Sequence, residues 1–99
     1  MATIHCAKIG SRKSVGAGAT KTVKWNNPPG QTVLGYTAIP IPPPASGEHG
    51  TSHGCVEVTG VRLTHHRDNH DGDRRFVQVA VKNHSEQEIE FDLYQSWIA

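Results

Sequence analysis

Apolar side chains alternate with polar ones through the C-terminal region from Val58 to Ile98, and this alternation constrains the fold more than any other feature. Three runs place large side chains at every second position: Val61, Leu63 and His65; Val77, Val79 and Val81; and Ile89, Phe91 and Leu93. A period of two is typical of half-buried β-strands. Turn-forming residues separate the runs at 67–74 and 83–87. The region is therefore predicted to form an antiparallel three-strand meander.

The apolar positions also determine the register expected for the two hairpins. Pairing Leu63 with Val79 gathers the apolar side chains of the first hairpin on one face. On the other face, the same register predicts two pairs: His66 with Phe76, and Arg62 with Ala80. The second hairpin is expected to contain three apolar pairs: Val81 with Ile89, Val79 with Phe91, and Val77 with Leu93.

The strand that opens this meander is expected to contain a β-bulge. Val58 lies at an even position, whereas Val61 and Leu63 lie at odd positions. Successive side chains of a strand point to opposite faces, so these residues share one face only if a residue is skipped between them. We therefore expect the bulge near Thr59 and Gly60.

The rest of the chain supplies further short strands. Alternation indicates strands at 3–9, 21–25 and 32–39, and no stretch shows helical periodicity over three turns. The proline-rich residues 40–54 are expected to form a long crossover loop or to cover a sheet edge. About six or seven short strands are typical of a small antiparallel β-sandwich, immunoglobulin-like or similar, with a small barrel as the alternative. With 99 residues, 1–99 is expected to be a single domain.

The composition limits the kinds of molecule that the chain is expected to bind and the cellular compartment in which it is expected to lie. Ten Lys and Arg against nine Asp and Glu give a net charge of +1, without the basic footprint of a nucleic-acid-binding protein. No apolar run is long enough for a membrane span or a signal-peptide core, so membrane insertion is not expected. The cytoplasm is the default location, with export by another route left open. Cys6 and Cys55 are then expected to be reduced thiols.

The candidate ligand site lies near the end of the first hairpin. In the predicted register, Phe76 lies on the face opposite the valines, at the mouth of the charged loop 67–74. The polar residues expected around it are Arg62, His66, His70 and Asp71. An aromatic ring flanked by such groups suits a sugar, because the ring stacks on the sugar's apolar face while polar groups bind its hydroxyls. The leading hypothesis is a non-catalytic, lectin-like module that binds a carbohydrate or similar polar ligand. The alternative is that Phe76 is an ordinary core residue.

The C-terminal tail supports a second hypothesis. Trp97 and Ile98 point to opposite sides of a strand, so one of them is expected to reach a second subunit. The alternative function is a self-assembling structural subunit, or one that docks a protein ligand, and a homo-oligomer is expected. The tail Ser96-Trp97-Ile98-Ala99 resembles the closing strand of H-type lectins. This resemblance implies an oligomeric β-sandwich.

Histidines are frequent, with seven in the chain. His49, His53 and Cys55 lie within one flexible segment and are ligand types that suit zinc or copper. Paired zinc-motif spacing is absent, so histidines without a special role are the alternative to a metal site.

The loop 67–74 carries oxygen ligands of the kind that hold calcium, namely Asp68, Asn69, Asp71 and Asp73. Its arginines cancel the negative charge, and the spacing does not fit an EF-hand. A solvated hairpin tip is therefore the alternative to a calcium site. The sequence contains no organised nucleophile–base pair and no cofactor fingerprint, so neither enzymatic activity nor a bound cofactor is predicted.

Overall fold

A computed structural model describes residues 3–26, 32–45, 47, 50, 52–70 and 72–99, with the backbone alone at 68 and 73. These residues form six β-strands: β1 (Ile4–Val15), β2 (Thr20–Asn26), β3 (Thr32–Ile41), β4 (Val56–Asp68), β5 (Gly72–Asn83) and β6 (Ile89–Ile98). The described part contains no helix, and therefore none that could cross a lipid bilayer. The prediction of an all-β chain is confirmed, and the six strands lie within the predicted range of about six or seven.

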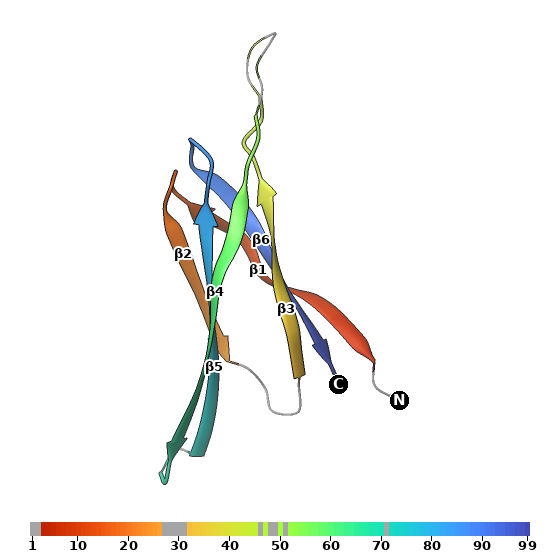
Figure 1. Ribbon diagram of the computed structural model, residues 1–99, viewed down its shortest axis with the longest axis vertical. Helices are drawn as coiled ribbons and strands as arrows, with labels where there is room; N and C mark the ends of the chain where they lie inside the picture. The colour runs from red at the N-terminus through yellow and green to blue at the C-terminus, as the bar shows by residue number, and fades with distance from the viewer. Residues whose placement is uncertain (1–2, 27–31, 46, 48–49, 51, 71) are drawn as a thin grey trace.

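The strands form two three-stranded antiparallel sheets (Figure 1). The β6 sheet has the order β1-β6-β3, and the β5 sheet has the order β2-β5-β4. The two central strands are consecutive in sequence but lie in different sheets. The predicted three-strand meander is therefore wrong, because β6 pairs with β1 and β3 instead of β5.

The apolar face of each central strand explains this arrangement. Val77, Val79 and Val81 of β5 and the alternating apolar residues of β6 are buried in one cluster. Two strands with one apolar face each can bury those faces by lying in different sheets with a core between them, as well as by pairing side by side. The β6 members of this cluster are Ile89, Phe91 and Leu93, and its remaining members are Val15 of β1 and Val23 of β2.

The first predicted hairpin, β4–β5, is confirmed, but its register differs by two residues. Leu63 lies opposite Val77 and not Val79, because the strands continue to Asp68 and Gly72 and leave a shorter turn than predicted. A shift of two residues keeps every side chain on its predicted face. The remaining corrected pairs are Val61 with Val79, His65 with Arg75, His66 with Arg74, and Arg62 with Gln78. The bulge expected at Thr59 and Gly60 is confirmed by a register shift between Val58 and Gly60.

Asn83 is a fully buried polar residue at the end of β5. Its Nδ2 donates to the carbonyl oxygens of Val15, Gly16 and Gln87 at 3.1, 3.2 and 2.8 Å. Its Oδ1 accepts a hydrogen bond from the backbone N–H of Ser85 at 2.7 Å. One side chain thus joins the end of β1 to the connection between β5 and β6.

A bulge in β1 places Arg12 in the left-handed region, with φ of 48°. Its backbone N–H donates to Oδ1 of Asp92 at 2.9 Å, and its guanidinium binds both carboxylate oxygens of Glu90. Lys8 Nζ lies 3.2 Å from the other Asp92 oxygen. The hydrogen bond from Arg12 and the ammonium of Lys8 hold the pKa of Asp92 below its usual value.

The Asp92→Asn variant is expected to be less stable than the wild type near neutral pH. A folded-state pKa below the unfolded value contributes stability above the unfolded pKa, and this contribution disappears as pH falls through the folded pKa. The variant should therefore lose less stability on acidification below about pH 4. Urea unfolding across this range measures the difference, with exposed Glu86→Gln as the control. An unchanged acid profile for Asp92→Asn would contradict the assignment.

Candidate functional site

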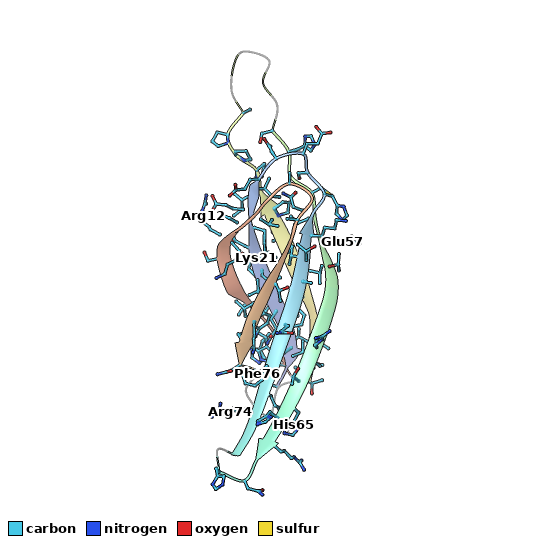
Figure 2. The ribbon with its side chains drawn as sticks, turned by 90° about the vertical axis from the view of Figure 1, so that its left-hand side faces the viewer. Arg12, Lys21, Glu57, His65, Arg74 and Phe76 are labelled. Carbon is cyan, nitrogen blue, oxygen red and sulfur yellow. The ribbon has the colours of Figure 1, made fainter. Side chains whose placement is uncertain are left out.

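The outer face of the β5 sheet carries several residues of the predicted ligand site. Side chains next to the inward-pointing valines of β5 point outward, because directions alternate along a strand. The register aligns the outward residues in three rows across β2, β5 and β4: Thr22, Ala80 and Gly60; Lys24, Gln78 and Arg62; and Asn26, Phe76 and Thr64. Figure 2 looks onto this face, with Phe76 beside the lower end of β2.

A hollow of about 310 Å³ lies on this outer face. Its lining residues are Thr22, Gly60, Val61, Arg62, Gln78 and Ala80. The small residues Ala80 and Gly60 lie in one row, and the longer side chains of Gln78 and Arg62 lie in the next. The hollow therefore combines a small apolar floor with a hydroxyl, an amide and a guanidinium group, which together donate and accept hydrogen bonds.

The same outer face has an excess of positive charge. Lys24 and Arg62 flank Gln78, and Lys82 lies on the opposite side of Ala80 along β5. Within the described residues, none of these three cations forms an ion pair. Glu57 lies opposite Lys82, but its carboxylate is 2.8 Å from Nε2 of His84. Arg62 therefore lines the hollow, while Lys24 and Lys82 lie at neighbouring positions of the register.

Phe76 is half-buried on this outer face and is not part of the buried core cluster. Lys24 Nζ lies 4.6 Å from the centroid of its ring, a cation–π contact. This contact places the ammonium group over the next row, which contains Phe76 and lies farther from Ala80 and Gly60. Arg62 and Phe76, both predicted site residues, thus share a face.

The other predicted ligand-binding residues lie nearer the hairpin tip. His66 is exposed and lies opposite Arg74 on the outer face. His70 is exposed in the turn between β4 and β5, and Asp71 lies outside the described residues. The structure therefore separates the tip from the hollow, which lies near the middle of the sheet face.

The predicted metal ligands lie in and near the loop before β4. His53 and Cys55 are exposed, and His49 lies outside the described residues. The backbone N–H of Cys55 donates to Oγ of Ser85 at 2.8 Å. Within the described part of the chain, no three His, Cys, Asp or Glu side chains group as metal ligands do.

The chain was compared with protein-family models, curated proteins and solved structures, and none of them matches it. The resemblance of residues 96–99 to H-type lectins therefore stays a prediction.

Trp97 and Ile98, the predicted interface residues, end the central strand of the β6 sheet. Trp97 lies opposite His5 of β1 and Val33 of β3. The rings of Trp97 and His5 stack with centroids 5.4 Å apart. The tail is thus docked within its own sheet, and both residues are half-buried.

A second surface, which the sequence did not reveal, lies on the side formed by the edge strands β3 and β4. Figure 1 looks onto this side and shows the two strands diverging toward the lower end. A groove of about 260 Å³ lies between them, lined by Val33, Leu34, Gly35, Tyr36, Val58, Val61 and Leu63. Leu34 and Leu63 are 52% and 65% exposed. In the sequence, only the lack of charged residues in 32–41 could have indicated this apolar surface.

Tyr36 lines this groove and is half-buried. Its ring contacts Trp25 edge-on at 5.4 Å between centroids, and so joins an edge strand of one sheet to an edge strand of the other. Burial raises the pKa of the Tyr36 phenol, which therefore stays protonated and donates to Oε1 of the buried Gln95 at 3.1 Å.

Proposed function

We propose that the two sheets form a β-sandwich, immunoglobulin-like or similar, that acts as a non-catalytic binding module for a carbohydrate. The observation that supports this function is the hollow on the outer face of the β5 sheet. Its donors and acceptors come from Thr22, Arg62 and Gln78, and its floor is the methyl group of Ala80 beside Gly60. A small number of polar groups around an apolar floor is typical of sites that orient a small ligand.

The charge of this face favours a carbohydrate that carries carboxylate or sulfate groups. Arg62 lines the hollow, and Lys24 and Lys82 lie near it on the same face. None of the three forms an ion pair within the described residues. A guanidinium binds a carboxylate or sulfate through charge-assisted hydrogen bonds, which are stronger than those between neutral groups. Phe76 adds an aromatic surface one row beyond Lys24.

The Arg62→Ala variant is expected to bind such a glycan at least about tenfold more weakly than the wild type, because it loses a charge-assisted hydrogen bond. Calorimetry with neutral, carboxylated and sulfated oligosaccharides measures the effect, and added salt should weaken binding of the charged ones. Arg75→Ala is the matched control, since Arg75 lies opposite His65 on the other face of β5.

Two outcomes would contradict the proposal. One is that no member of the carbohydrate panel binds the wild-type protein. The other is that Arg75→Ala weakens binding as much as Arg62→Ala does, which would show that the outer face has no special part in recognition. Equal affinity for neutral and charged sugars would keep a carbohydrate site but remove the role assigned to the cations.

A self-assembling subunit is the second candidate function. The groove between β3 and β4 favours it, because Leu34, Val61 and Leu63 are aliphatic and about half or more exposed. Contiguous exposed apolar side chains rimmed by polar residues mark protein interaction sites. The proposed occupant of this side is a second copy of the chain.

A further inference from the structure

We infer that a second copy of this chain pairs with the free edge of β3, so that two β6 sheets join into one six-stranded sheet across a two-fold axis. This inference rests on the second candidate function, self-assembly. One edge of β3 pairs with β6, and no strand of the described residues pairs with its other edge. Such an edge presents backbone N–H and C=O groups to another strand.

The composition of β3 distinguishes it from the other edge strands. Its ten residues include no charged side chain. Charges protect the other three edges from pairing: Lys8, Arg12 and Lys13 in β1; Lys21 and Lys24 in β2; and Glu57, Arg62 and Arg67 in β4. Natural proteins place charges on exposed edges to prevent association, so a long uncharged edge is suited to pairing.

The middle of β3 is regular, whereas its ends are not. The bulge between Val33 and Gly35 interrupts one end, and Pro40, which lacks an N–H, lies near the other. From Gly35 to Ile39 every residue pairs in sequence with β6. Residues 35–39 therefore offer the edge that a second strand can pair with.

The symmetry of an antiparallel strand pair indicates that the strand added to β3 is the β3 of a second copy of this chain. A two-fold axis at Thr37 places Thr37 opposite itself, Gly35 opposite Ile39 of the second copy, and Tyr36 opposite Ala38 of the second copy. Each large side chain then lies beside a small one, and the inner and outer faces of the two sheets coincide. Self-pairing of a charged strand would bring like charges together, which β3 avoids.

This pairing also covers part of the groove. The second copy's β3 extends the inner face of the β6 sheet, on the side where Val61 and Leu63 of β4 are exposed. Removing these side chains from water adds a hydrophobic contribution to the backbone hydrogen bonds of the new strand pair.

The test uses Thr37, which is exposed at the middle of β3. Thr37→Lys and Thr37→Glu each place two like charges opposite one another at the axis. By sedimentation equilibrium, the wild type is expected to be dimeric, each variant alone monomeric, and an equimolar mixture of the two dimeric again. Recovery in the mixture shows that both variants are folded. Thr22→Lys, which adds the same charge to the edge strand β2, should stay dimeric.

The outcomes separate this inference from the functions proposed above. A monomeric wild type overturns both self-assembly and the pairing of β3. A dimeric wild type whose Thr37 variants stay dimeric, or whose mixed variants stay monomeric, leaves self-assembly standing and overturns the pairing. Glycan binding uses the other sheet, so Thr37→Lys should bind oligosaccharides as the wild type does.

Discussion

Replacing Phe91 by alanine is expected to lower the free energy of unfolding by about 4 kcal/mol, the usual cost of removing a fully buried phenylalanine. Phe91 is completely buried in β6 and belongs to the cluster that contains the valines of β5. The truncation therefore leaves a cavity among residues of both sheets. Urea denaturation followed by circular dichroism measures the change.

The chain offers a matched control in its other phenylalanine. Phe76 is half-buried on the outer face of the β5 sheet, where Lys24 covers its ring. Phe76→Ala removes the same side chain without a core cavity, so its cost should be about 1 kcal/mol or less. Equal destabilisation by the two substitutions would contradict the separation of core and outer face.

The Asn83→Ala variant is expected to lose about 3 kcal/mol of stability, because it leaves buried and part-buried backbone groups without their partner. The carbonyl oxygens of Val15 and Gln87 lose a donor, and the backbone N–H of Ser85 loses its acceptor. Thermal and urea unfolding measure the loss. A Tm within a degree or so of the wild type would show that water replaces the amide.

Two further variants sharpen this prediction. Asn26→Ala removes an exposed asparagine from the end of β2 and should change stability by about 0.5 kcal/mol or less. Asn83→Asp keeps the shape but places a carboxylate against backbone carbonyl oxygens, which raises the folded-state pKa of the new acid. Its stability should therefore fall as pH rises through the acid's unfolded pKa, unlike that of the alanine variant.

The alternation of side chains predicted the C-terminal strands and the face of each residue, but not the sheet to which each strand belongs. Val79 and Phe91 were expected to be neighbours in one sheet, and they occupy different sheets within one core cluster. Both arrangements bury the same side chains, so the alternating pattern is identical for the two. The hairpin register was wrong by two residues for the same reason, since a shift of two preserves the faces.

The candidate site was predicted only in part. Arg62 and Phe76 were expected on one face, and they are. The hollow itself depends on Thr22 of β2 lying opposite Ala80 of β5, a pairing between segments far apart in sequence. No local pattern indicates that pairing. The uncharged stretch 32–41 could have been noticed, but its position at a sheet edge required the topology.

The pairing of the first strand with the last has a consequence for how the chain folds. Ile4 of β1 lies opposite Ile98 of β6, and β2 pairs with β5, so most ladders join distant segments. Folding rates fall as the sequence separation of contacts rises, and slow folding of this kind is expected on the scale of milliseconds to seconds. During synthesis β1 is made before β6 and therefore lacks its pairing strand until β6 has been made. We expect the like charges of Lys8, Arg12 and Lys13 on that strand to oppose aggregation of nascent copies until β6 is made.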